Sequence, residues 1–167
     1  EYTPDWTIIT AGAWSPNLVK KIGADLPVQP AKGYSVSYNR TGLSIKTPLI
    51  LFEAKIGVNP VIDGVRLAGS LELTGIDSSI NKKRVQAIVD GAHQYLAGDS
   101  AKFDVSNVWT GMRPVTPDGI PVIDKIPNME NLIVATGHAM LGMTMGPITG
   151  KVVSEIVVGD KHSIDLT

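Results

Sequence analysis

An arginine directly before a proline is the first feature of this 167-residue sequence that could bind a small acid. Arg113 ends an apolar stretch, and Pro114 fixes the backbone after it and removes one N–H donor. A guanidinium in so rigid a position can grip a carboxylate through two parallel hydrogen bonds. A simpler interpretation makes Arg113 half of a structural ion pair and Pro117-Asp118-Gly119 a plain turn. Composition alone leaves both interpretations open.

A glycine-rich segment, residues 137–144, leads from an apolar run into a helical pattern. Unpaired N–H groups at a helix start stabilise nearby negative charge, and glycines let a flat ligand approach the backbone. A reduced flavin, which is negative at the N1/C2-carbonyl edge of its ring, would suit such a site. Alternatively, Gly137 ends a strand, His138 is a satisfied surface residue, and Gly142 and Gly146 permit close helix packing. Pro147 restricts the helix start, so we expect an irregular first turn.

Composition limits the other kinds of function. The net charge is -1, and the one basic cluster, residues 82–84, opens a helical pattern, so we expect no nucleic-acid partner. Cysteine is absent and the three histidines are far apart, so we expect no metal site. No apolar stretch has the ~20 residues of a membrane span and no leader pattern is present, so the sequence itself predicts a soluble chain.

The segments that must position the glycine-rich run are of the α/β type. Residues 6–10 form a β-rich run that ends in Ala11-Gly12, as a buried parallel strand does before a helix. Ser15 and Pro16 suit a helix start, with Leu18, Val19 and Ile22 as the apolar face and Gly23 as the end. Residues 131–136 and a last helix carrying Val152, Val153, Ile156 and Val157, stopped by Gly159, complete this part.

The middle of the chain predicts an antiparallel sheet with one helix. Residues 34–38 alternate with period two, 39–42 form a turn, and 49–52 are apolar. Residues 56–62 and 65–73 form a hairpin about Asp63-Gly64. Asp77 or Ser78 can cap a helix whose apolar face is Val85, Ile88, Val89, Ala92 and Leu96, beside a structural His93, and a strand follows at 105–113. The sequence therefore predicts an α+β fold, with a mainly antiparallel lobe flanked by residues 1–24 and 119–159, which share one layer.

Several motifs in order resemble one enzyme family. They are residues 109–122 (WTGMRPVTPDGIPV), Asn131-Leu132, Gly137-His138 with Gly142 and Thr144, residues 11–15 (AGAWS), Lys32-Gly33-Tyr34, and residues 65–73 (VRLAGSLEL). Together they resemble the carboxyl-terminal part of the D-amino acid dehydrogenases, whose wider family includes D-amino acid oxidase, glycine oxidase and sarcosine oxidase. Each piece alone is weak, but their order covers nearly the whole chain.

The resemblance implies an FAD-dependent oxidation of a D-amino acid to its imino acid, which water hydrolyses to a 2-oxo acid and ammonia. Arg113 would bind the substrate carboxylate, and the main-chain carbonyl of Met140 would face the substrate amine. The implied cofactor contacts are Gly12, Gly137, His138, Leu141, Gly142, Met143 and Thr144. The implied domains are residues 1–24, the last strand and helix of an FAD-binding lobe; 25–116, a substrate-binding lobe; and 117–167, a return to the FAD-binding lobe.

The sequence also departs from the family pattern. Ala139-Met140 replaces smaller residues, Asp124 stands where glycine often occurs, and Gly57 falls where glycine oxidases place a substrate tyrosine. The G-x-G-x-x-G turn that seats the FAD pyrophosphate is absent from these residues. We therefore expect a fragment that lacks most of an amino-terminal FAD-binding lobe and is inactive alone.

Other hypotheses remain open at this point. One is a glycine or sarcosine oxidase-like enzyme, which passes electrons to oxygen where a dehydrogenase uses a quinone. Another is a non-catalytic binding module that has lost the flavin, which would expose the flank of the strand at residues 6–10 and favour a homodimer through that edge. The resemblance implies a cytoplasmic protein, with a peripheral position on the inner face of the membrane left open for the complete enzyme.

Overall fold

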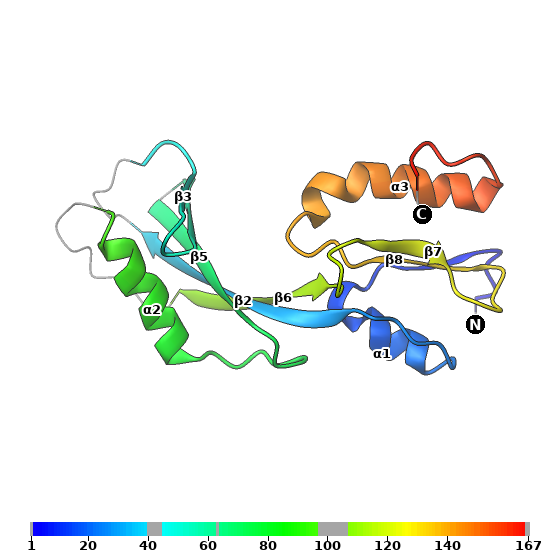
Figure 1. Cartoon of the computed structure of the whole chain (residues 1–167), viewed down its shortest axis with the longest axis horizontal. Coiled ribbons are helices and arrows are strands. Elements are labelled where there is room, and N and C mark those ends of the chain that lie inside the picture. The colour runs from blue at the N-terminus through cyan, green and yellow to red at the C-terminus, as the bar shows by residue number, and fades with distance from the viewer. Residues whose placement is uncertain (1, 40–44, 63, 97–106, 166–167) are drawn as a thin grey trace. The chain divides into compact units, whose positions relative to one another are not determined.

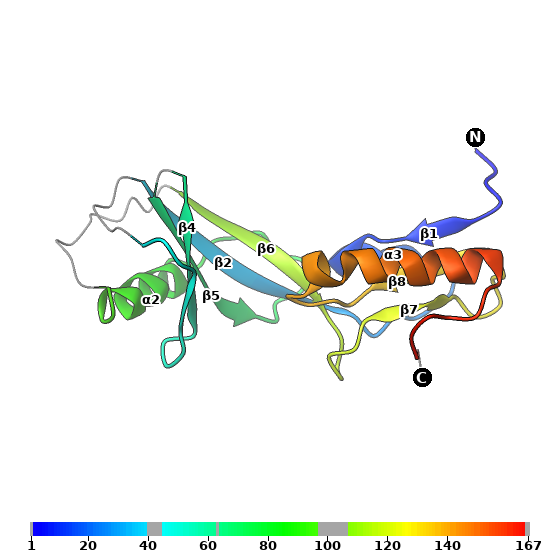
Figure 2. The ribbon, with the colours of Figure 1, turned by 90° about the horizontal axis from the view of Figure 1, so that it is seen from above.

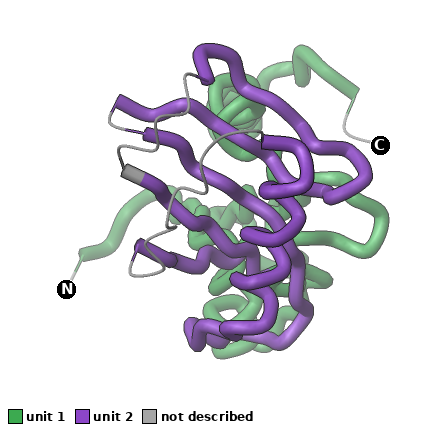
Figure 3. The backbone as a smooth tube through the Cα atoms, turned by 90° about the vertical axis from the view of Figure 1, so that its left-hand side faces the viewer, with its two compact units in different colours: residues 1–31, 113–167 green, residues 32–112 purple. Residues whose placement is uncertain are grey.

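The structure, a computed structural model, describes residues 2–39, 45–62, 64–96 and 107–165. The chain divides into two compact units, residues 1–31 with 113–167 (unit 1) and residues 32–112 (unit 2), as Figure 3 shows. The unit boundaries fall inside two long strands, β2 (Gln29–Asn39) and β6 (Val108–Val115). The expected α+β class, with mainly antiparallel strands, is confirmed.

Unit 1 is a three-stranded sheet between two helices. Its strand order is β1 (Thr7–Ile9), β8 (Leu132–Thr136), β7 (Val122–Lys125), with β1 parallel and β7 antiparallel to β8. All five residues of β8 are buried, because its alternate side chains pack on opposite faces. Ile133 packs with Val152 and Ile156 of α3 (Gly142–Val158), and Leu132 and Val134 pack with Val19 of α1 (Ser15–Lys20). Figure 1 shows α3 and α1 on opposite sides of this sheet.

The first strand of unit 1 corrects one expectation. The parallel pairing of residues 7–9 with β8 is confirmed, but β1 is not buried in this structure, since Ile8 is 43% exposed. Among the described residues β1 pairs only with β8, so its other flank is an open edge. The helix start is also different, because Trp14 is the residue before the helix and Ser15 is its first residue. Of the expected apolar face only Val19 is buried.

Unit 2 is an antiparallel sheet with one helix on one face. Its strand order is β3 (Leu49–Leu51), β4 (Ile56–Val61), β5 (Gly64–Glu72), β2, β6. The core forms where Tyr34, Val36, Val58 and Leu67 meet α2 (Lys82–His93), which contributes the expected Val85, Ile88, Val89 and Ala92. Gly91 permits this close approach, because a Cβ there would lie 2.9 Å from Ile56 Cδ1. Figure 2 shows α2 alongside β2 and β5.

The helix boundaries of unit 2 correct two further expectations. Asn81, not Asp77 or Ser78, caps α2, because its side chain accepts a hydrogen bond from Lys83 N. The helix ends at His93, so Leu96 packs on the core from beyond it. The β4–β5 hairpin has the expected position, although Asp63 itself lies outside the described residues. So do residues 40–44, which hold most of the expected 39–42 turn, and residues 105 and 106 of the expected 105–113 strand.

Candidate functional site

The carboxyl ends of the two parallel strands of unit 1 bring Gly12 and Gly137 to the same edge of the sheet. Gly12 follows β1 with φ +55, and its carbonyl accepts a hydrogen bond from Thr136 Oγ1 at 3.1 Å. Gly137 follows β8 with φ +89. Such an edge is the usual ligand-binding position of sheets with parallel strands. The local fold therefore places two of the predicted cofactor-binding residues where a ligand would be expected.

Packing within the protein also requires a glycine at position 137. A Cβ on it would lie 2.8 Å from Thr116 Cγ2, so the segment after β6 packs against its bare backbone. That segment is a turn in which Asp118 accepts a hydrogen bond from Ile120 N at 3.0 Å, and this bond is the main cause of the lowered pKa of Asp118. The Pro117-Asp118-Gly119 sequence is therefore a turn that supports the glycine-rich segment.

Arg113, near the end of β6, lies close to the glycine-rich segment of residues 137–144. Pro114 O accepts a hydrogen bond from Ala139 N at 2.9 Å, and Val115 forms an antiparallel bridge with His138. The backbone of Arg113 consequently lies beside residues 138–140. Its side chain is half-buried, and no hydrogen bond or ion pair joins its guanidinium to any residue that the structure describes. The geometry therefore gives no support, within that part of the chain, to the interpretation of Arg113 as half of a structural ion pair.

The amino end of α3 is open. No side-chain hydrogen bond caps it at Leu141, and its first turn has no acidic residue. Leu141 N donates to His138 O and Met145 N to Leu141 O, both at 2.8 Å, so the N–H groups of Gly142, Met143 and Thr144 are the ones that a first turn leaves without a helical partner. Met140 and Met143 are 79% and 96% exposed. The helix begins ahead of Pro147, which lies inside it, so Pro147 is not at the helix start, and the irregular first turn stays a prediction.

His138 sits between this helix and the sheet. Its Nε2 lies 2.8 Å from Thr149 Oγ1, and burial lowers its pKa. It lines a cavity of about 330 Å³ together with residues of β1, β8 and α3. The other lining residues are Ile8, Thr10, Ala135, Gly142, Gly146, Thr149, Gly150 and Val153. His138 is thus a hydrogen-bonded, half-buried residue whose cofactor contact stays a prediction.

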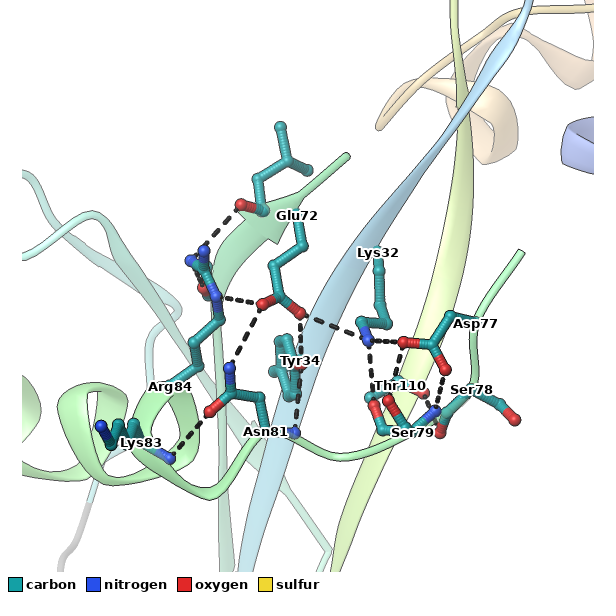
Figure 4. Close-up of polar contacts among 12 residues, drawn as sticks. Lys32, Tyr34, Glu72, Asp77, Ser78, Ser79, Asn81, Lys83, Arg84 and Thr110 are labelled. Atoms are coloured by element: carbon teal, nitrogen blue, oxygen red, sulfur yellow. Dashed lines mark hydrogen bonds and ion pairs between the residues drawn. The ribbon is translucent and has the colours of Figure 1, made fainter. Parts of the chain in front are cut away.

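A cluster of charged side chains in unit 2 was missed by the sequence reasoning. Lys32 and Glu72 are both buried, and they connect Asp77 and Arg84 in one network, which Figure 4 shows. The only sequence signal for it was a carboxylate, Glu72, inside the apolar run of residues 71–73.

Metal-binding clusters and membrane-spanning helices are both absent from the described part of the chain. No group of three or more histidine or acidic side chains there could hold a metal ion. None of the helices there is both long enough and apolar enough to span a membrane.

The chemistry of the site fits a planar, electron-accepting ring with a negative edge, the property of a flavin. Uncapped helix N–H groups favour negative charge, the backbone of residues 137–142 is rich in glycine, and the backbone at Arg113 lies beside it. The arrangement is therefore compatible with the class of flavin-dependent oxidoreductases.

Comparison with known families agrees with this class. Residues 1–156 match the DAO family, described as FAD dependent oxidoreductase. The chain therefore belongs to this family of FAD-dependent oxidoreductases, and FAD is the cofactor of the family.

Individual relatives show which members of the family the chain resembles. The chain is 35% identical over 166 residues to a D-amino acid dehydrogenase of Vibrio atlanticus (strain LGP32), covering 98% of this chain and 39% of that protein. It is 37% identical over 164 residues to the D-amino acid dehydrogenase of Vibrio vulnificus (strain CMCP6), covering 96% and 39%. The crystal structure of glycine oxidase from Geobacillus kaustophilus matches with a TM-score of 0.86 and 26% identity, over 99% of this chain and 45% of that one. The chain thus spans about two fifths of the length of the curated relatives that it matches.

Proposed function

We propose that this chain supplies the substrate-anchoring and flavin-facing part of an enzyme that oxidises D-amino acids to imino acids. The observation that carries the proposal is the hydrogen bond between Pro114 and Ala139, which sets Arg113 beside the glycine-rich segment. The relatives named D-amino acid dehydrogenase support the choice of substrate. Hydrolysis of the imino acid by water then gives a 2-oxo acid and ammonia.

Each residue of the site has a defined task in this proposal. The guanidinium of Arg113 binds the substrate carboxylate through two hydrogen bonds and so fixes the orientation of the α-carbon. The main-chain carbonyl of Met140 accepts a hydrogen bond from the substrate amine. When bound, FAD supplies the two-electron acceptor for the hydride that leaves the α-carbon.

The cofactor would be held by backbone more than by side chains. The N–H groups of Gly142, Met143 and Thr144 would be the donors available to the negative edge of the ring, and Gly12 and Gly137 turn the chain at the strand ends with positive φ. His138 and Leu141 complete the contacts of this segment. All of these are contacts of residues in unit 1.

The remaining polypeptide of the enzyme would complete the nucleotide site. The open edge of β1 and the apolar cavity lined by Ile8, Val153 and the glycines of α3 are suited to a further strand and helix. We assign these surfaces to an amino-terminal FAD-binding lobe, without which residues 1–167 alone would be inactive. Association of two copies through the β1 edge is the competing outcome.

A second candidate activity is that of a glycine oxidase-like enzyme. It is favoured by the structural match to glycine oxidase, and it differs in the electron acceptor, which is oxygen where a dehydrogenase uses a quinone. Gly57, where glycine oxidases place a tyrosine, argues for the D-amino acid side of this choice. A position on the inner face of the membrane, which quinone reduction would favour, is part of the dehydrogenase proposal.

The test is the FAD content and turnover of the full-length gene product. We expect a yellow protein that oxidises D-amino acids but not L-amino acids, with a quinone analogue as acceptor, and a colourless protein when residues 1–167 are produced alone. Hydrogen peroxide production from glycine would favour the oxidase alternative. A full-length product that binds no flavin would overturn both, and dimerisation of residues 1–167 would then point to a binding module.

A further inference from the structure

An irregularity in the unit 2 sheet places two opposite charges side by side. Between the pairs Tyr34↔Gly69 and Lys32↔Glu72, β2 advances by two residues and β5 by three, which is a β-bulge. Ser70, inside the bulge, has φ +62, and its Oγ accepts a hydrogen bond from Arg84 Nη1 at 2.9 Å. Bulges re-aim the side chains that follow them. This one brings Glu72 level with Lys32 in the buried part of the sheet.

The ammonium group of Lys32 is completely satisfied. It is only 2% exposed, and it contacts three acceptors: it donates hydrogen bonds to Asp77 Oδ2 at 2.7 Å and Ser79 O at 3.0 Å, and it forms an ion pair with Glu72 Oε2 at 3.3 Å. The hydrogen bond to Asp77 is the main reason that the pKa of Lys32 is raised. Two of the three acceptors belong to the segment between β5 and α2.

We call residues 73–81, which join β5 to α2, the strap. It contains no helix or strand, and Leu73, Ile76 and Ile80 are 59%, 45% and 47% exposed. Two of its polar groups, Asp77 Oδ2 and Ser79 O, bind Lys32, as Figure 4 shows, and Asn81 at its end contacts Tyr34 and Glu72. Apolar burial therefore contributes little to holding the strap, and polar contacts hold it in place.

The two cations of the cluster serve different elements. Lys32 binds the strap, whereas Arg84 binds Glu72 and Ser70 from the first turn of α2. Glu72 contacts both cations and also accepts a hydrogen bond from Tyr34 OH at 2.5 Å. Removal of Lys32 leaves Glu72 paired with Arg84. It would therefore weaken the attachment of the strap to the sheet but not that of α2.

The strap is connected to the strand that carries Arg113. Ser78 O accepts a hydrogen bond from Thr110 Oγ1 of β6 at 3.4 Å, and Arg113 is three residues further along the same strand. β6 is at the edge of the five-stranded sheet, where β2 is its one hydrogen-bonded neighbour among the described strands. We propose that Lys32 is a positioning residue that pins the strap to β2 and, through the strap, steadies β6.

The test is amide hydrogen exchange in the full-length gene product carrying Lys32→Met. Methionine keeps the length of the side chain and removes its three donors. We expect exchange in residues 73–81 and 108–112 to become at least about tenfold faster, while β4 and the centre of α2 stay as in the parent. Lys83→Met, at an exposed position of α2, is the matched control and should change neither region.

A second variant guards against failure of Lys32→Met to fold. Asp77→Ala removes the strap side of the same contact at a more exposed position and should speed exchange in the same residues. Faster exchange throughout unit 2 with either variant would show a general stabilising role and overturn the proposal. Unchanged exchange in the strap with a folded variant would overturn it as well.

A kinetic test of the same variant rests on the proposed function. With Lys32→Met we expect KM for a D-amino acid to rise about three- to tenfold and kcat to change less than about twofold, since Arg113 would be less well placed. An unchanged KM alongside faster strap exchange would overturn the link to β6. The proposed function itself fails separately, if replacement of Arg113 is also without effect.

Discussion

The two longer helices of the chain begin in opposite ways. At the start of α2, Asn81 accepts a hydrogen bond from Lys83 N, and Arg84 is tied to Glu72. At the start of α3 no side-chain hydrogen bond caps the helix, and glycine and methionine occupy its first turn. A helix that satisfies its own first turn is a scaffold, whereas one that leaves its donors open is suited to an external acceptor. This difference favours the ligand-binding role that we propose for the start of α3 in unit 1.

The largest expected contrast is between two leucines. Leu67 is fully buried in the unit 2 core, so Leu67→Ala should lower the free energy of unfolding by about 2–5 kcal/mol. Leu141, 57% exposed at the start of α3, should tolerate the same substitution within about 0.5 kcal/mol. Urea unfolding of the full-length gene product measures both. Equal losses would mean that the start of α3 is already covered in the complete protein.

The caps themselves give the next contrast. Asn81→Ala should destabilise the protein by about 1 kcal/mol, because Lys83 N loses its acceptor. Leu141→Asp should give α3 the cap that it lacks and stabilise the flavin-free protein by up to about 1 kcal/mol. The same carboxylate would compete with a negative flavin edge, so FAD content should fall. Retention of FAD by the Asp variant would contradict the proposed orientation of the ring.

These contrasts show what sequence reasoning could and could not supply. The hairpin about Asp63-Gly64 and the apolar face of α2 rest on local patterns, and both expectations agree with the described residues. The predicted cap of α2 was wrong because Asp77, Ser78 and Asn81 are all good capping residues. Asp77 is instead engaged in a tertiary contact with Lys32, which the local sequence does not show. The neighbouring contact of Lys32 with Glu72 depends on the bulge at Ser70, which no local pattern indicates.

In the candidate site, too, some features are indicated by the sequence and others depend on tertiary contacts. The resemblance singled out Arg113 and residues 137–144, and their roles stay predictions. The resemblance implied that Arg113 and Met140 lie close together, but no local pattern indicates the contact that joins these distant parts of the chain, a hydrogen bond from Ala139 N to Pro114 O. The packing of Thr116 against Gly137 is likewise a tertiary reason for a glycine that the sequence explained by a ligand.

A smaller effect is expected at Ala139, which has φ +48 in the segment that would face the flavin. A side chain is disfavoured in this left-handed conformation, so Ala139→Gly should stabilise the protein by about 0.5–1 kcal/mol. Ala135→Gly, in the buried strand β8, is the matched control and should destabilise it. Thermal unfolding distinguishes the two, and a loss of stability with both would mean that Ala139 is held by contacts of its methyl group.

The smallest expected effect is a pH dependence of unit 2. The pKa of Asp77 is lowered, first by its hydrogen bond with Lys32, and that of Glu72 is lowered, first by Tyr34. Depressed carboxyl pKa values stabilise the fold above the pKa of the unfolded chain, and this contribution is lost as pH falls through the folded pKa. The urea midpoint should therefore decline less steeply between about pH 5 and 3 in Asp77→Asn than in the parent. Parallel declines would mean that Asp77 makes no net electrostatic contribution.

The central claim, that the open site of unit 1 holds a substrate carboxylate through Arg113, is tested most directly by the turnover of one variant pair. In the full-length gene product, Arg113→Ala should lower kcat/KM for a D-amino acid about 100- to 1000-fold while FAD content is unchanged. Arg66→Ala, at an exposed position of β5, should leave both unchanged. Full activity of Arg113→Ala in a flavin-loaded protein would contradict the account.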